Sequence, residues 1–272
     1  MSYNTTIPPL DKPEVRHALN QAIDREALIK SLFQDAGATP AENLIPPTMW
    51  SWNKDVKTDA YNPEAAKKVL ADAGRIDLLV NNAGMGLLGG AEESSTAQAQ
   101  ALFDVNVFGV IRMTNEVLPT MRRQGTGRIV NLSSVQGFIP APYFALYSST
   151  KHAVEGYSES LDHELRPFGI RVALVEPAYT RTSFEDNLAR PDQLLDIYDA
   201  ARAGMTIAVR KAMEKGDAPE VVANTVLAAA TDPAPKRRYA AGKMARQVSL
   251  LRRFVPASAF DKSLRKQLGL PV

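Results

Sequence analysis

The sequence predicts an α/β fold, in which a doubly wound parallel sheet of about four strands follows a helical N-terminal segment. Two observations favour this fold class. From Gly74 onward, short apolar runs alternate with longer stretches that carry a helical pattern. The runs are almost continuously apolar, as expected of parallel strands covered by helices on both faces. Residues 1–73 instead show helical and loop patterns without a convincing strand.

Three helices are expected within residues 1–73. They are placed over residues 11–23, 25–33 and 62–74, where Asp or Asn precedes each apolar pattern and a glycine closes the last one. We therefore divide the chain into a helical segment, residues 1–73, and an α/β portion, residues 74–272.

The elements after Gly74 follow one another as strand, helix, strand, helix and strand. They are expected at Ile76–Asn82, from about Thr96 to Arg122, at Arg128–Ser133, from about Tyr147 to Arg166, and at Ile170–Glu176. The pattern of residues 183–216 is weaker, and this stretch is expected to form a mobile lid.

The composition excludes several classes of site. The chain has 272 residues, 45% of them hydrophobic, and no run approaches the roughly 18 apolar residues that cross a bilayer. No integral membrane segment is expected, and the first residues lack a secretion signal, so a cytoplasmic location is expected. The absence of cysteine excludes disulfides and thiolate ligands. Three scattered histidines form no ligand cluster, so no metal site is expected: His17, His152 and His163.

Positive charge is concentrated at the C-terminal end. The net charge is +2, yet residues 234–272 carry ten Lys or Arg against one Asp, a charge of +9. A basic segment with interspersed aromatic residues can bind nucleic acid or anionic lipid. A solvated face on terminal helices is the simpler interpretation, and no nucleic-acid partner is expected.

The run "NNAGMGLLGG" contains Gly84-x-Gly86-x-x-Gly89, which matches the spacing of a dinucleotide-binding turn. In such a turn a helix begins at once and its N-terminus receives the pyrophosphate. Here the next helix is expected only at residues 94–96. An acidic residue that would bind the ribose, Asp104, falls within that helix. The match is therefore interpreted as a coincidence of spacing.

Tyr147 and Lys151 stand one helical turn apart, on the same face of a helix. A phenol has a pKa near ~10 in water, and a neighbouring ammonium in a cleft of low dielectric constant would lower it. Tyr147 would then exchange a proton with an alcohol or a carbonyl at neutral pH. Ser134 follows the carboxyl end of a strand, where open parallel sheets bind ligands, and its hydroxyl would hold the substrate oxygen.

Further residues accompany this pair in a fixed order: Asn81-Asn82-Ala83-Gly84, Asn106 in "DVNVFG", Ser134, and "VEPAYTRT" after the last apolar run. From Gly74 to about Val272 the sequence resembles the short-chain dehydrogenases/reductases of the classical type. Their fold is Rossmann-like. The resemblance implies an oxidoreductase that uses NAD or NADP and acts on a small-molecule secondary alcohol or carbonyl.

The resemblance also implies a role for each of these residues. Tyr147 would be the general acid and base, Lys151 would lower its pKa and bind the nicotinamide ribose, Ser134 would orient the substrate, and Asn106 would position a water. The cofactor would contact Asn81, Ala83, Gly84, Tyr147, Lys151, Pro177, Thr180 and Thr182. The substrate would contact Gln136, Tyr143 and Phe184. Ala178 stands where the family usually has glycine.

The N-terminal half of the family's cofactor site is missing upstream of Gly74. No Thr-Gly-x-x-x-Gly-x-Gly turn precedes it. Weak cofactor binding is therefore expected. Strand 76–82, central in the intact family, would become an edge, through which the chain would self-associate.

Residues 8–74 resemble a different family. The stretches "PEVRHALNQAIDREALIKSLFQDAGATPAENLIPPTMWSWN" and "YNPEAAKKVLADAG" are similar to part of a periplasmic dipeptide- or oligopeptide-binding protein. The chain is thus expected to be a chimera. The alternative to an impaired oxidoreductase is a catalytically silent chimera with a structural or peptide-interacting role.

Overall fold

The computed structural model describes residues 74–182, 184 and 187–267. The chain divides into two compact units, Met1–Ile76 and Asp77–Val272. All described helices and strands belong to the second unit. The helices expected within residues 1–73, and the stretch that resembles a peptide-binding protein up to residue 73, lie outside the described residues.

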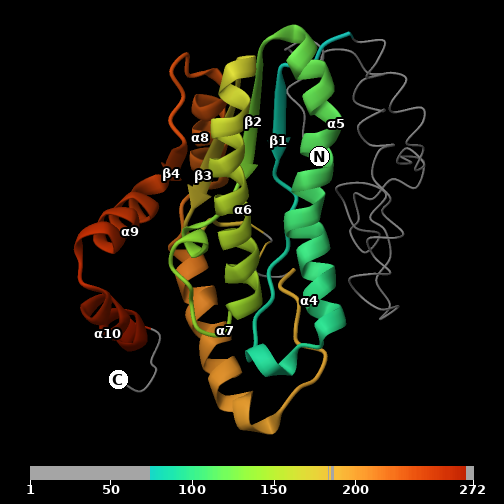
Figure 1. Ribbon diagram of the computed structural model, residues 1–272. Coiled ribbons are helices and arrows are strands. Elements are labelled where there is room, and N and C mark those ends of the chain that lie inside the picture. The colour runs from blue at the N-terminus through green and yellow to red at the C-terminus, as the bar shows by residue number, and fades with distance from the viewer. Residues whose placement is uncertain (1–73, 183, 185–186, 268–272) are drawn as a thin grey trace, which may run out of the picture. The chain divides into compact units, whose positions relative to one another are not determined.

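Four parallel strands form one sheet in the order β1-β2-β3-β4, which confirms the predicted fold class (Figure 1). Three of them coincide with the predicted strands: β1 (Leu78–Asn81), β2 (Gly127–Leu132) and β3 (Ile170–Pro177). The fourth strand, β4 (Arg238–Ala241), has no apolar run to reveal it in the sequence. It pairs with β3 from Leu174 to Pro177.

The sheet is covered on both faces, and β3 shows how its alternating side chains divide between them. Ala173 and Val175 pack with Ala229 of α8 (Pro219–Thr231). Leu174, between them, packs on the other face with side chains of α5 (Gly109–Gln124) and α6 (Ala145–Leu165). Figure 1 shows α5 and α6 on one side of the sheet and α8 on the other. The period of two along a strand therefore fills two separate cores.

The single helix expected from Thr96 to Arg122 is interrupted. The structure has α4 (Thr96–Phe103), then a π-helical turn η2 (Asp104–Phe108), then α5. Such wide turns occur inside longer helices, frequently at functional sites. The prediction of a continuous helix is wrong at this turn, which contains Asn106.

The expected lid is largely helical. The short turn η5 (Asp196–Tyr198) leads into α7 (Asp199–Glu214), so a regular helix occupies the second half of residues 183–216. The chain ends its described part with α9 (Gly242–Phe254) and α10 (Ala257–Gln267), which follow β4. No helix of the described residues has both the length and the apolar character that crossing a membrane requires.

Candidate active site

Tyr147 and Lys151 lie in the first half of α6, which crosses the carboxyl end of β2. Each side chain is only 7% exposed, and Lys151 Nζ lies 5.7 Å from the centre of the Tyr147 ring. Lys151 Nζ also donates a hydrogen bond of 2.8 Å to the carbonyl of Leu132, the last residue of β2. The structure thus brings the predicted pair together and fixes it against the edge of the sheet.

Ser134 stands between the ends of two strands. Its Oγ caps the short turn η3 (Val135–Gly137) by accepting a hydrogen bond from the amide of Gln136, and donates one of 3.5 Å to the carbonyl of Pro177 at the end of β3. The Ser134 hydroxyl also hydrogen-bonds to Tyr147, which lowers the pKa of Tyr147 in part. Three predicted residues therefore meet at the carboxyl edge, where open parallel sheets bind ligands.

Asn106 joins the loop after β1 to α6. Its Oδ1 accepts from the Met85 amide at 2.8 Å, while its Nδ2 donates to the Met85 carbonyl and to Thr150 Oγ1. Both amide protons are used in this way, and the residue is 2% exposed. The π-helical turn directs this side chain toward the loop.

Burial controls the protonation of the Tyr147–Lys151 pair. Loss of water raises the pKa of Tyr147 to about 12 and lowers the pKa of Lys151 to about 8, although the carboxylate of Glu155 opposes the second shift. At neutral pH the lysine is charged and the tyrosine keeps its proton. In the chain by itself the pKa of Tyr147 is raised and not lowered as predicted, because burial of the phenol outweighs the hydrogen bond with Ser134.

The three glycines of "GMGLLG" have another use than binding phosphate. A Cβ at Gly86 would lie 2.4 Å from Leu188, and one at Gly89 would lie 2.0 Å from Pro191. The backbone here pairs with the same segment, since the Leu88 amide donates to the Ala189 carbonyl. These two glycines therefore let residues 188–191 pack closely. Gly84 faces the site instead, because a Cβ added to it would lie 3.6 Å from Lys151 Nζ.

The other residues predicted to bind the cofactor lie in two places, at or just after the end of β1 and in the segment that follows β3. The Asn81 side chain is buried and donates to Asn131 Oδ1 at 2.8 Å, so it connects two strands. Ala83 lies in the loop that follows β1. Thr180 forms an isolated bridge with Asp217, and Thr182 Oγ1 accepts from the Phe184 amide. The segment after Pro177 therefore runs along the edge of the site.

Of the residues predicted to contact substrate, Phe184 lies nearest to the tyrosine, with its ring 5.9 Å from the Tyr147 ring. Gln136 Oε1 accepts from Ser148 Oγ, next to Tyr147 in the chain. Tyr143 has a positive φ of 62° and packs at the border of the same apolar cluster. The structure places all three near Tyr147 or its neighbours.

Sequence reasoning missed the apolar cover of the site. Tyr147 belongs to one buried cluster with side chains from three other parts of the chain: Leu88, Phe144, Met205, Val209 and Met213. The last three come from α7 and stand four residues apart. This spacing places the three side chains on one face of a helix, and it is the feature of the sequence from which the apolar cover could have been predicted.

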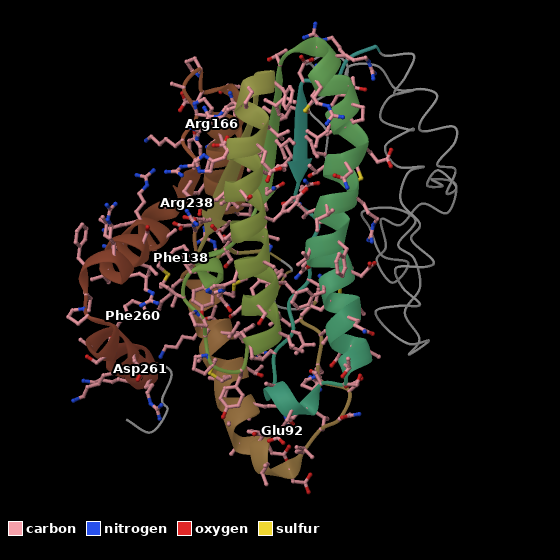
Figure 2. The ribbon with its side chains drawn as sticks, in the orientation of Figure 1. Glu92, Phe138, Arg166, Arg238, Phe260 and Asp261 are labelled. Atoms are coloured by element: carbon pink, nitrogen blue, oxygen red, sulfur yellow. The ribbon has the colours of Figure 1, made fainter. Side chains whose placement is uncertain are left out.

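A group of carboxylates below Lys151 was also missed. Glu155 of α6 and Glu176 of β3 are buried, and Arg238 of β4, which is labelled in Figure 2, lies at the centre of the group. Arg238 forms ion pairs with both carboxylates and with Glu159. Burial and the nearby Glu176 carboxyl raise the pKa of Glu155 to about 7. No sequence spacing could find this group, because its members come from three different elements.

Fold and site together define an α/β protein with a buried tyrosine–lysine pair at the carboxyl edge of a parallel sheet. A family model described as short chain dehydrogenase matches residues 34–193, and the chain belongs to this family. The match begins well before Gly74, so the family resemblance starts earlier than the sequence analysis placed it.

Three relatives illustrate the range of similarity. An uncharacterized oxidoreductase of Schizosaccharomyces pombe is 32% identical over 216 residues, 79% of this chain and 91% of the relative. A 3-ketodihydrosphingosine reductase of Bacteroides thetaiotaomicron is 42% identical over 133 residues, 49% of either chain. The 17-beta-hydroxysteroid dehydrogenase type 1 of Homo sapiens is 37% identical over 187 residues, 66% of this chain and 57% of that protein.

Solved structures agree with the fold. A short-chain dehydrogenase from Streptomyces avermitilis is 33% identical, with a TM-score of 0.59 over 74% of this chain and 70% of that one. A short-chain dehydrogenase/reductase from Burkholderia phymatum, in complex with NAD, is 31% identical, with a TM-score of 0.54 over 65% and 66%.

Proposed function

We propose that this chain is an oxidoreductase that transfers a hydride between NAD or NADP and a secondary alcohol or carbonyl. The observation that carries the proposal is the convergence of Tyr147, Lys151 and Ser134 at the carboxyl edge of the sheet. When bound, the nicotinamide would supply or accept the hydride. The chain's own residues would move the proton.

Each residue has a distinct part in this reaction. In reduction the Tyr147 hydroxyl gives its proton to the carbonyl oxygen, and in oxidation the Tyr147 phenolate takes the proton of the alcohol. The Ser134 hydroxyl donates a hydrogen bond to the same oxygen. Lys151, charged below a pKa of about 8, stabilises the phenolate that remains. Asn106 acts through position, since it holds the Met85 loop against α6.

The described residues fit the nicotinamide half of the cofactor. Gly84 leaves its Cβ space open toward Lys151 Nζ and Asn106 Oδ1, at 3.6 and 3.4 Å. A ribose hydroxyl at this point would meet an ammonium donor in a site shielded from water. We propose that Ala83, the Asn81 backbone and residues 177–182 line the remainder of this half.

Fewer residues are available to bind the pyrophosphate half of the cofactor. Residues 1–73 contain a single glycine, Gly37. A glycine-rich turn that brings a helix N-terminus close to the pyrophosphate needs several glycines, so these residues cannot supply one. This supports weak cofactor binding. It is also the reason for proposing a chimeric origin, although the family match already begins at residue 34, before the boundary near residue 74 that the sequence analysis placed. It also favours the second candidate function, a catalytically silent chimera that keeps the site without using it.

The substrate is proposed to be an apolar small molecule. Tyr147 is enclosed by aliphatic, aromatic and methionine side chains, and Phe184 lies against its ring. Such a wall favours a hydrocarbon over a sugar or a charged acid. Two of the relatives carry the words hydroxysteroid and ketodihydrosphingosine in their names, which is consistent with this proposal.

The deciding experiment is a titration with NADH and NADPH followed by nicotinamide fluorescence, with turnover of apolar ketones measured in parallel. Binding in the millimolar range with slow, saturable turnover would support the impaired oxidoreductase. Micromolar binding would refute the argument about the pyrophosphate half. The absence of both binding and turnover would favour the silent chimera.

A further inference from the structure

We propose that α9 and α10 form a surface that binds the face of an anionic lipid bilayer. The first observation is a set of large apolar side chains that α9 presents to solvent. Their exposed fractions are 47% for Met244, 60% for Leu250, 51% for Leu251 and 73% for Phe254. A soluble surface scatters such residues singly, whereas here four come from one helix of 13 residues.

These side chains lie along one side of α9. Met244 and Leu251 are two turns apart, and Leu250 and Phe254 are one turn apart, so all four fall within an arc of about 120°. Ala245, toward the opposite side, is fully buried. The helix therefore contacts the body of the protein through a small residue, while its large apolar residues stay exposed. This is the reverse of an ordinary surface helix. Leu250 and Met244 line two open hollows beside the body, and Leu251 and Phe254 lie outside both hollows.

Positive charge borders this apolar side. Arg246 and Arg253 lie two turns apart along one margin, and Arg252 lies toward the other. The Arg253 guanidinium lies 5.6 Å from the Phe254 ring. The sequence of α9 contains no acidic residue. Within the described part of the chain, no ion pair neutralises these three arginines.

The adjoining helix extends the same surface. α10 adds Lys262, Arg265 and Lys266 against the single Asp261, and the Arg252 guanidinium lies 5.7 Å from the Phe260 ring (Figure 2). Figure 1 shows both helices leading away from the sheet beyond β4. At 13 and 11 residues they are too short to span a bilayer, which needs about 20.

An anionic bilayer is the partner that uses both features. Apolar side chains flanked by Arg and Lys are typical of helices that lie in the plane of a membrane surface. Nucleic acid would use the charge but leave the leucines in water. A second copy would bring two surfaces of the same positive charge together. The surface is independent of the proposed reaction, although a membrane would also be a source of apolar substrate.

The test is co-sedimentation of the full chain with two kinds of vesicle. One kind is phosphatidylcholine alone, and the other contains about 30% of the anionic lipid phosphatidylglycerol. We expect binding to the anionic vesicles at least about tenfold stronger than to the neutral ones, and weaker binding at high salt. The double variant Leu251→Ser/Phe254→Ser should lose at least about tenfold in binding. Arg246→Gln/Arg253→Gln should do the same.

A matched control is Ile207→Ser on α7, which removes a side chain that is 67% exposed outside this surface. It should bind like the wild type, and melting curves should show that all variants are folded. Equal binding to both kinds of vesicle would overturn the proposal. So would a double variant that binds like the wild type, or a surface that instead forms a dimer or binds nucleic acid through Leu251 and Phe254.

Discussion

Lys151 Nζ lies 5.7 Å from the centre of the Tyr147 ring, and both side chains are almost removed from water. With this ammonium beside the ring, the pKa of Tyr147 in the chain alone is still raised to about 12, because burial disfavours the phenolate. Lys151 by itself therefore does not ionise the phenol at neutral pH. We infer that a bound oxidised nicotinamide would add positive charge that favours the phenolate.

The first prediction concerns the proton donor. Tyr147→Phe keeps the ring in its apolar cluster and removes only the hydroxyl, so turnover of an accepted ketone should fall at least about 100-fold. The free energy of unfolding should change by less than about 1 kcal/mol. Steady-state kinetics and urea denaturation measure the two quantities. Near-normal turnover in this variant would refute the assignment.

The second prediction concerns the charge on Lys151, whose pKa of about 8 in the folded chain lies below the usual 10.5. The unfolded chain binds more protons between these values, so stability rises with pH across this window. Lys151→Met removes the effect. The stability of the variant relative to the wild type should therefore be higher at pH 7 than at pH 10, by about 2.5 kcal/mol.

Urea denaturation from pH 7 to pH 10 checks this difference. Tyr147 does not interfere in that range, because a raised pKa costs stability only as the pH rises above 10. The control is Lys211→Met on the exposed side of α7, which makes the same replacement at a lysine that is not buried. A Lys151→Met difference that is constant with pH would contradict the prediction.

The third prediction concerns Asp162, which joins α6 to β3. Its buried carboxylate accepts hydrogen bonds from Arg166, Arg171 and the Val172 amide. Burial opposes its ionisation, but these bonds outweigh burial and lower its pKa. Asp162→Asn leaves two guanidinium groups without their carboxylate and should cost about 3 kcal/mol of unfolding free energy at pH 7.

The stabilisation from Asp162 should disappear as the pH falls below its ordinary value of 3.8. Asp104→Asn is the matched control, because Asp104 pairs with Arg112 while both side chains are more than half exposed. It should cost less than about 1 kcal/mol. Equal losses in the two variants would mean that burial does not set the strength of these ion pairs.

The fourth prediction tests the use of the glycines after β1. Gly89→Ala places a Cβ 2.0 Å from the rigid ring of Pro191 and should destabilise the chain by about 2 kcal/mol. Gly204→Ala, in α7 with open space around it, should instead stabilise it by up to about 1 kcal/mol. Thermal melts measure both. If Gly89→Ala left stability unchanged and weakened only cofactor binding, a phosphate-binding turn would be indicated.

The fifth prediction concerns the edge of the sheet. Within the sheet of the described residues, β1 pairs only with β2, and Leu78 and Val80 remain 43% and 36% exposed. We expect concentration-dependent self-association through this edge, measured by sedimentation velocity. Val80→Lys should reduce it, since lysine on an edge opposes further strand pairing. Leu227→Lys on α8 should leave it unchanged, and a monomeric wild type at all concentrations would refute the idea.

Residues that act locally could be predicted from the sequence. Tyr147 and Lys151 share a helix, and β1, β2 and β3 are continuous apolar runs. The π-helical turn could not be predicted, because it depends on bonds from Asn106 to Met85 and Thr150, up to 44 residues away. The raised pKa of Tyr147 depends on the cover provided by α7, which is likewise a tertiary effect.

Arg238 also sets an order of assembly. As the chain leaves the ribosome, α6 and β3 emerge first and bring Glu155 and Glu176 together in a place without water. The guanidinium that neutralises them follows 62 residues after Glu176. Without Arg238, two buried carboxyl groups would lie together with no cation to favour their charged forms, which opposes docking of α6 on β3. We therefore expect the candidate site to be completed only after the last strand has been synthesised, and a chain that stops before Arg238 should not form it.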